Sequence, residues 1–187
     1  MIKTNIPLVG LAAYSGTGKT TLLTQIIRLF RHRGLRVGVI KHTHHTFEID
    51  LPGKDSYELR QAGASQVLIG SKKRWALIVD REEQEELNFQ QYLQNLDQDT
   101  LDIILIEGFK PEAIPKIELN RVALKKPYLY PNDSSIIAVA TDQREPLATQ
   151  LPVLDLNRPE NIADFILDRF LPNHKIAIRS ATITTSQ

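Results

Sequence analysis

The chain of 187 residues contains no cysteine. Neither a disulfide nor a thiolate metal site can therefore form, which fits the reducing cytoplasm where we expect this protein. No apolar run approaches the roughly 18 residues that a membrane-spanning helix needs, so no membrane association is expected. The 23 basic and 22 acidic residues are mixed along the chain and leave a net charge of +1. That balance provides no basic face for nucleic acid.

Hydrophobic residues make up 42% of the chain. A domain of this length buries roughly 70% of the surface that its unfolded chain exposes, so a real core is possible. The sequence shows neither an internal repeat nor an interdomain linker. We expect a single domain over residues 1–172, followed by a tail, 173–187, that has no helical pattern.

The N-terminal part alternates short apolar runs with a helical pattern. Residues 8–13 are almost wholly apolar, as in a strand covered on both faces. Apolar residues then recur at helical spacing from Leu22 to Phe30, and Gly34 follows as a C-terminal cap. Residues 36–40 form a second buried-type strand. This succession predicts a βαβ unit with parallel strands and a right-handed crossover.

The remaining pattern extends this unit into an α/β fold of the P-loop NTPase type: a mostly parallel sheet with helices on both faces. Asp55 and Glu58 resemble a capping box that opens a short helix. The other predicted elements are an antiparallel hairpin (66–70 and 75–79), helices (86–96 and 160–171) and strands (102–106, 116–122 and 136–141).

A glycine-rich break separates the first strand from the first helix. Ala13, Gly18, Lys19 and Thr20 match the pattern [A/G]-x-x-x-x-G-K-[S/T]. We expect main-chain N–H groups of residues 16–20 to wrap a β-phosphate at the helix N-terminus. Lys19 would bridge β- and γ-phosphate oxygens, and the Thr20 hydroxyl would ligate Mg²⁺. An ordinary glycine-rich turn is the alternative, which the position between strand and helix disfavours.

A carboxylate is needed to complete the Mg²⁺ shell, and Asp102 and Glu107 flank the most apolar strand. Ligands of such sheets bind at the carboxyl ends of the strands. Five residues of about 3.3 Å each place Asp102 about 16 Å away, at the wrong end. Glu107 is therefore the candidate, with a solvated carboxylate as the alternative. Asp50 and Asp55 are further candidates for this shell, although Asp55 equally suits a helix cap.

Three histidines follow the second strand. His42 and His44 fall on one side if the strand continues, and imidazoles so spaced could bind a transition metal. Contact with phosphate, substrate or a partner protein is one alternative, and a plain polar loop is another. The sequence leaves the role of His45 equally open.

Recognition of a base is the weakest part of the pattern. Typical GTPases carry Asn-Lys-x-Asp after a late strand, and this chain has Thr141-Asp142 there instead. The Asp142 carboxylate could accept hydrogen bonds from the N1–H and N2–H groups of guanine. A turn aspartate is the alternative.

Several stretches, in this order and spacing, resemble the MobB family of molybdopterin-guanine dinucleotide biosynthesis proteins: "AAYSGTGKTTLL", "VIKHTHH", "PGKDSYELRQAGA", "RWAL", "IILIEGFK" and "IIAVATD". The resemblance runs from about residue 6 to residue 170. It implies a homodimeric GTP-binding protein with feeble GTPase activity. Such a protein assists the guanylyltransferase MobA, which attaches GMP to molybdopterin, and molybdopterin itself is a possible ligand. The implied nucleotide-binding residues are Ser15, Gly16, Thr17, Gly18, Lys19, Thr20 and Thr21, with Glu107 in the Mg²⁺ role.

The hairpin supplies a physical basis for a dimer. Trp75 and Leu77 fall on one of its faces, and its edges can pair with a second copy. In the alternative, the hairpin folds over its own sheet.

Two other functions fit the same phosphate loop. A small-molecule kinase needs a lid with arginines, and the arginines here are scattered: Arg60, Arg74, Arg121 and Arg158. A binding module would keep the nucleotide as a structural ligand only. Neither an arginine finger nor a glutamine that orients water is evident, so fast hydrolysis is not indicated.

Overall fold

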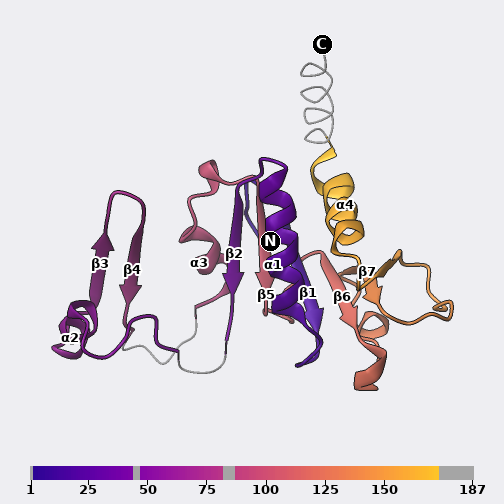
Figure 1. Ribbon diagram of the computed structural model, residues 1–187, viewed down its shortest axis with the longest axis horizontal. Coiled ribbons are helices and arrows are strands. Elements are labelled where there is room, and N and C mark those ends of the chain that lie inside the picture. Colours follow the sequence, from indigo (N-terminus) through magenta and orange to yellow (C-terminus); the bar gives the residue numbers. More distant parts are fainter. Residues whose placement is uncertain (1, 44–46, 82–86, 173–187) are drawn as a thin grey trace, which may run out of the picture. The chain divides into compact units, whose positions relative to one another are not determined.

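The computed structural model describes residues 2–43, 47–81 and 87–172 (Figure 1). These residues divide into two compact units. The larger takes in the described parts of Met1–His42 and Phe89–Gln187, and the smaller those of Thr43–Asn88. Among the described residues, no helix has both the length and the apolar character needed to cross a membrane.

The larger unit is built on a six-stranded sheet in the order β2-β5-β1-β6-β7-β8. All neighbouring strands are parallel. Their carboxyl ends therefore share one edge, with β1 between β5 and β6. The strands are β1 (Leu8–Ala13), β2 (Val37–Lys41), β5 (Ile103–Glu107), β6 (Lys116–Asn120), β7 (Ile136–Thr141) and β8 (Val153–Asp155).

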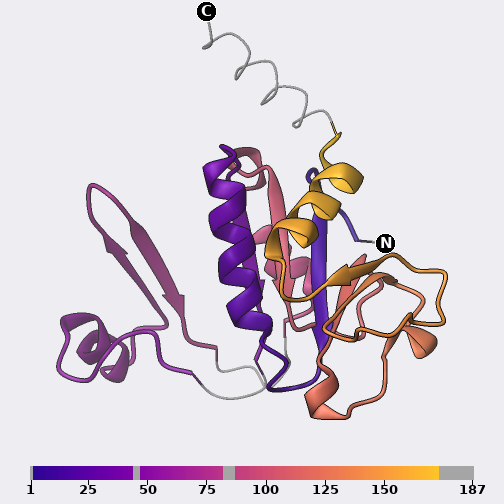
Figure 2. The same ribbon diagram turned by 45° about the vertical axis from the view of Figure 1, so that its right-hand side comes forward.

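Helices cover both faces of this sheet (Figures 1 and 2). On one face, α1 (Lys19–His32) and α4 (Pro159–Phe170) pack on the strands through residues such as Ile26 and Ile162. On the other face, α3 (Phe89–Gln94) buries Phe89 and Leu93. Each fully buried side chain of this size contributes roughly 1.5–3 kcal/mol. The predicted α/β class, with a parallel sheet between helices, is confirmed.

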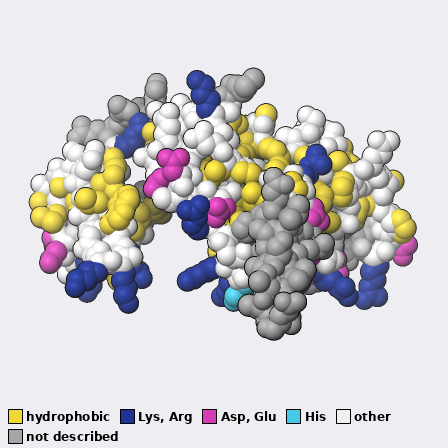
Figure 3. All heavy atoms as spheres, turned by 90° about the horizontal axis from the view of Figure 1, so that it is seen from above, with side chains coloured by type: hydrophobic (Ala, Val, Ile, Leu, Met, Phe, Trp, Pro, Cys, Tyr) yellow, Lys and Arg dark blue, Asp and Glu magenta, His cyan; other side chains and the backbone are white. Residues whose placement is uncertain are grey.

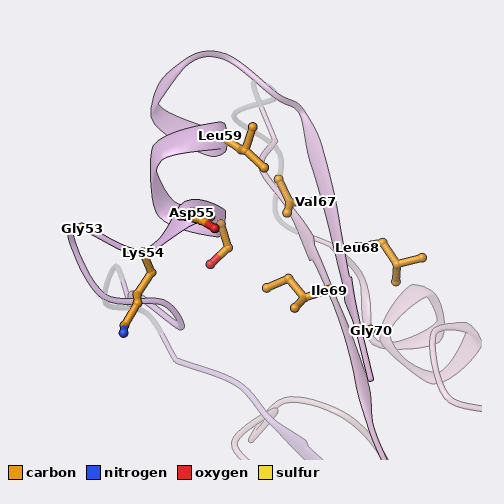
Figure 4. A pocket seen from close by; sticks show the side chains of 9 residues that line it. Gly53, Lys54, Asp55, Leu59, Val67, Leu68, Ile69 and Gly70 are labelled. Carbon is orange, nitrogen blue, oxygen red and sulfur yellow. The ribbon is translucent and has the colours of Figure 1, made fainter. Parts of the chain in front are cut away.

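The smaller unit contains α2 (Asp55–Gln61) and the antiparallel hairpin of β3 (Gln66–Gly70) and β4 (Trp75–Val79). Val67 and Ile78 pair across the hairpin and are buried. A hollow of about 610 Å³ lies between α2 and β3 (Figure 4). Figure 4 shows Val67 and Ile69 pointing toward α2, while Leu68 points away, as the alternation of a strand requires.

The opposite face of the hairpin is apolar and exposed. Leu77 pairs with Leu68 and Trp75 with Gly70, which places all of them on this face. Trp75 is 71% exposed and Leu77 45% exposed. The expectation that these two side chains share a face is confirmed. Hydrophobic side chains are visible at the surface of this unit in Figure 3 (yellow, left).

Several elements differ from the sequence prediction. Asp55 is the first residue of α2 and not its cap: Lys54 precedes the helix, and Glu58 accepts a hydrogen bond from Gly53 N at 3.3 Å. The carboxylate of Asp55 is favourable in the first turn because it faces the positive end of the helix dipole. The strand expected over 116–122 ends at Asn120, where Arg121 precedes a 3₁₀ turn.

A further difference is β8, which the sequence did not predict because three residues show no clear alternation. The helix expected over 86–96 is shorter, α3 being Phe89–Gln94, and residue 86 lies outside the described residues. The predicted tail, 173–187, lies outside them as well. The single domain over residues 1–172 stays a prediction. Short 3₁₀ helices connect the elements: η1 (Gln98–Thr100), η2 (Val122–Leu124) and η3 (Tyr130–Asn132).

Candidate nucleotide-binding site

The predicted phosphate loop joins the centre of the sheet to the first helix. The chain leaves β1 after Ala13 and enters α1 at Lys19. Gly16 has a φ of 79° and Gly18 a φ of 97°, a left-handed conformation that a larger residue adopts only with strain. Gly18 precedes the helix without a side-chain cap. The N-terminus of α1 is thus available to an anion, which such helix ends attract.

Two side chains of the loop donate hydrogen bonds to the main-chain carbonyl of Tyr14. The buried Thr17 donates its hydroxyl hydrogen to the Tyr14 carbonyl at 2.8 Å. Lys19 Nζ donates to the same carbonyl at 3.0 Å and to that of Ala13 at 3.3 Å. Burial lowers the pKa of Lys19, and the nearby Glu107 carboxylate opposes that shift. Two other predicted loop residues, Ser15 and Thr21, are exposed.

Additional cations lie around Tyr14. The ammonium groups of Lys110 and Lys126 each lie 5.8 Å from the centre of its ring, within the range of a cation–π interaction. The sequence reasoning missed both lysines, because they are distant from the loop along the chain. Together with Lys19, they give this end of the loop a positive field that suits a phosphate group.

Thr20 and Glu107 meet at the carboxyl edge of the sheet. Thr20 Oγ1 lies 3.3 Å from Oε1 and 3.4 Å from Oε2 of Glu107. Lys41 pairs with Glu107 in the register of β2 and β5, and its Nζ lies 3.7 Å from Oε2. A hydroxyl and a carboxylate are oxygen ligands of the kind that Mg²⁺ takes together with phosphate and water. These two residues therefore fit a Mg²⁺ ion that accompanies a nucleotide.

The protein offers this ion only a partial shell. Within the described residues, no three histidine or carboxylate side chains gather closely enough to hold a metal ion by themselves. Asp102 lies at the opposite end of β5, where its carboxylate accepts hydrogen bonds from Arg36 N at 2.7 Å and Nη2 at 3.0 Å. The strand-end argument that separated Asp102 from Glu107 thus agrees with the structure.

Asp50 and Asp55 belong to the smaller unit. Asp50 Oδ1 accepts a hydrogen bond from Arg60 Nη2 at 2.8 Å, and this hydrogen bond holds the pKa of Asp50 below its ordinary value. Arg60 also reaches Asp80, with an Nη1–Oδ2 distance of 3.1 Å. Asp55 is exposed in the first turn of α2. The Mg²⁺ role suggested for these two aspartates stays a prediction.

His42 continues the pairing of β2 with β5, since its N–H donates to the Glu107 carbonyl at 2.9 Å. Its ring packs 4.6 Å from that of Phe109 and 6.0 Å from that of Tyr92, measured between centroids. Gly108 allows this approach, because a Cβ there would lie 2.9 Å from the His42 Cβ. His44 and His45 lie outside the described residues.

Asp142 lies at the end of β7, where both of its carboxylate oxygens accept hydrogen bonds. Val122 N donates to Oδ1 at 2.8 Å, and Arg121 Nη1 donates to Oδ2 at 3.2 Å. Arg121 Nε also donates to the Thr17 carbonyl of the phosphate loop at 3.3 Å. The sequence reasoning missed this role of Arg121, because the strand predicted over 116–122 enclosed it, whereas β6 ends at Asn120.

A hollow of about 330 Å³ opens beside Asp142, between the ends of β7 and β8. Asp155 and Asn157 line it, and both were missed because β8 itself was not predicted. The remaining lining residues are Thr141, Gln143, Arg144, Val153 and Leu154. The hollow is thus connected to the phosphate loop through Asp142 and Arg121.

A parallel sheet whose central strand leads through a G-K-T turn into a helix defines an α/β protein of the P-loop class. The family described as "Molybdopterin guanine dinucleotide synthesis protein B", or MobB, matches residues 8–142. The chain therefore belongs to the MobB family, as its sequence motifs indicated.

Individual relatives agree with this assignment. A "Molybdopterin-guanine dinucleotide biosynthesis adapter protein" of Escherichia coli (strain K12) is 49% identical over 167 residues, covering 89% of this chain and 94% of the relative. The protein of the same description from Haemophilus influenzae is 44% identical over 161 residues, covering 86% of this chain and 88% of that relative. The crystal structure of a "molybdopterin-guanine biosynthesis protein B (mobB)" superposes with a TM-score of 0.67 at 28% identity, covering 87% of this chain and 98% of that one.

Proposed function

We propose that this member of the MobB family is an adapter protein of molybdopterin-guanine dinucleotide synthesis that binds GTP and Mg²⁺ at its phosphate loop. Its partner is a MobA-type guanylyltransferase. Relatives of this chain are described as adapter proteins of that synthesis. The observation that carries the nucleotide part is the meeting of Thr20 with Glu107 beside a glycine-rich loop that ends in Lys19.

The loop residues act on the phosphates of the nucleotide. The Lys19 ammonium, which contacts the carbonyls of Ala13 and Tyr14, exchanges these contacts for phosphate oxygens. Thr20 and Glu107 hold Mg²⁺, directly or through its water, and Lys41 balances part of the Glu107 charge. When bound, Mg²⁺ supplies positive charge to the β- and γ-phosphate oxygens.

Slow hydrolysis is part of the proposal. An arginine finger must reach the transferred phosphoryl group with a free guanidinium. Arg121, which reaches the loop, is engaged by Asp142 and by the Thr17 carbonyl. Arg121 is therefore not free to serve as this finger, and we expect slow hydrolysis, which suits an adapter.

A homodimer is the assembly that we propose. The exposed face of the hairpin carries four large apolar side chains: Leu68, Trp75, Leu77 and Val79. A contiguous apolar face of this kind marks a protein interface. A second copy of the hairpin offers a matching face, because a symmetric dimer brings the same surface of both subunits together.

Calorimetric titration of the purified chain with GTP, GDP and ATP, with and without Mg²⁺, tests the nucleotide proposal. GTP is expected to bind more tightly than ATP, and Mg²⁺ is expected to strengthen its binding. A preference for ATP, with fast phosphorylation of a small molecule, would favour the kinase alternative. Addition of the chain to a MobA-type enzyme should raise the rate of GMP attachment to molybdopterin; an unchanged rate would contradict the adapter role.

A further inference from the structure

Arg121 connects the phosphate loop to the turn that follows β7. Its Nε donates to the Thr17 carbonyl at 3.3 Å, and its Nη1 donates to Asp142 Oδ2 at 3.2 Å. A Cβ built on Gly18 would lie 3.8 Å from Arg121 Nη2, so the guanidinium reaches the loop at van der Waals distance. The side chain of Arg121 is 36% exposed and that of Asp142 21% exposed.

The strand order brings these groups together. In the register of the sheet, Ala13 of β1 pairs with Leu119 of β6, and Asn120 of β6 pairs with Thr141 of β7. The phosphate loop, Arg121 and Asp142 therefore leave three adjacent strands at the same edge. Val122 N fixes the second carboxylate oxygen of Asp142 at 2.8 Å, so the carboxylate is oriented from two sides.

The contact with Thr17 has a consequence for the loop. The peptide group between Thr17 and Gly18 is planar and trans, so its C=O and N–H point in opposite directions. Because Arg121 holds the carbonyl, the N–H of Gly18 is turned away from the guanidinium. Orientation of such N–H groups is what makes a loop of this kind a nest for an anion.

We propose that Arg121 is a positioning residue of the phosphate loop and that Asp142 is its anchor. Asp142 then acts on nucleotide affinity through the phosphate end of the site and does not read the base. This inference rests on the proposed function, since it concerns the same nucleotide site. Arg121 and Val122 N already donate to the two oxygens of Asp142, so about half of the acceptor positions of this carboxylate are used within the protein.

Tripolyphosphate separates the two roles of Asp142, because it carries the anionic tail of a nucleotide without a base. Its affinity and that of GTP are measured by calorimetry for the wild-type chain, Asp142→Asn, Arg121→Gln and Arg121→Lys. The control is Asp155→Asn, since Asp155 lines the same hollow and its ion-pair partner is Arg158. Circular dichroism and a thermal melt show whether each variant folds.

Asp142→Asn is expected to lower the affinities for GTP and for tripolyphosphate by the same factor. That factor is about tenfold, the scale for one charge-assisted hydrogen bond. Arg121→Gln should weaken the binding of both ligands by a similar factor. A double variant that combines Asp142→Asn with Arg121→Gln should bind no more weakly than Arg121→Gln alone, because the two residues act as one unit. Arg121→Lys keeps the positive charge but loses the planar guanidinium with its several donors. It should therefore also lower both affinities. The Asp155→Asn control should bind tripolyphosphate as the wild type does.

Three results would overturn the inference. Weaker GTP binding with unchanged tripolyphosphate binding in Asp142→Asn would make Asp142 a reader of the base. Tighter tripolyphosphate binding in that variant would mean that Asp142 restrains an arginine which contacts phosphate directly. Wild-type tripolyphosphate affinity in Arg121→Lys would mean that the planar guanidinium of Arg121 does not position the loop. This variant also decides the question if Asp142→Asn does not fold. A wild-type chain that binds neither ligand would refute the proposed function itself.

Discussion

The Thr20 hydroxyl lies 3.3 Å from a carboxylate oxygen of Glu107, although 87 residues separate them in the sequence. The contact follows from the sheet: β1 and β5 are parallel neighbours, with Leu11 opposite Glu107 in their register. Thr20, through its hydroxyl oxygen, and Glu107, through its carboxylate, would be the residues that hold a Mg²⁺ ion here. The two oxygen atoms that would bind the metal ion are thus already close together before a nucleotide binds.

Glu107→Gln should remove most of the gain in GTP affinity that Mg²⁺ provides, because the amide keeps the shape but not the charge of the carboxylate. We expect a loss of about tenfold in that gain, equivalent to about 1.4 kcal/mol. Titrations with GTP in Mg²⁺ and in EDTA measure it, with Glu112→Gln as the control. An undiminished Mg²⁺ effect would assign the metal to other residues.

Lys19→Ala should weaken GTP binding by about 10- to 100-fold, the range expected for the loss of hydrogen bonds to charged groups of about 1.5–3 kcal/mol. Calorimetry measures the loss. Lys54→Ala, an exposed lysine of the smaller unit, provides the control. If Lys19→Ala keeps the wild-type affinity, the phosphate loop is not the nucleotide site.

Trp75→Glu should convert the proposed dimer into monomers, because it places a charge on the exposed apolar face of the hairpin. Its side chain is 71% exposed, so the fold of the monomer should be preserved. Light scattering gives the mass, and a thermal melt checks the fold. Lys72→Glu in the hairpin turn also introduces a glutamate, but outside the paired strands, and should leave the mass unchanged. A dimer that persists in Trp75→Glu would place the interface elsewhere.

Glu118 should make the stability dependent on pH. The side chain is fully buried on β6, and its oxygens accept hydrogen bonds from Leu129 N at 2.7 Å and Tyr130 N at 2.8 Å. Burial raises the pKa of Glu118, and the negative charge of Asp133 raises it further. The unfolded chain therefore releases this proton at a lower pH than the folded protein does.

It follows that Glu118 contributes stability that is complete below its ordinary pKa of 4.5 and is lost as the pH rises through the higher folded value. The free energy of unfolding of the wild type, minus that of Glu118→Gln, should fall as the pH is raised from about 4.5 through the higher pKa of the folded protein. Urea unfolding across this range measures the difference. Glu160→Gln, an exposed residue of α4, should give a constant difference. A difference for Glu118→Gln that rises with pH would contradict the argument.

Much of the fold could be predicted because local patterns decide it. The boundaries of β1, β7 and both strands of the hairpin agree with the apolar runs, and the loop lies where the glycine pattern placed it. The place of Glu107 at the carboxyl edge could be predicted, because a parallel sheet has one such edge and a strand of five residues has two distant ends.

The rest depends on long-range order, which local patterns do not carry. Arg121 reaches the phosphate loop only because β6 lies between β1 and β7, and the sequence gives no strand order. The hollow beside Asp142 depends on β8, whose three residues leave too short a signal. Asp55 was misplaced for a different reason. Aspartate is favourable both as a helix cap and in the first helical turn, so its presence does not fix the residue at which the helix begins.

The central position of β1 has a thermodynamic consequence. Hydrogen bonds from β5 and β6 occupy both of its edges, so the stretch that leads into the phosphate loop opens to solvent only when the sheet as a whole comes apart. Its amides should be among the slowest to exchange with deuterium. A compound that occupies the loop should then delay global unfolding of the larger unit, so a simple melting curve reports occupancy.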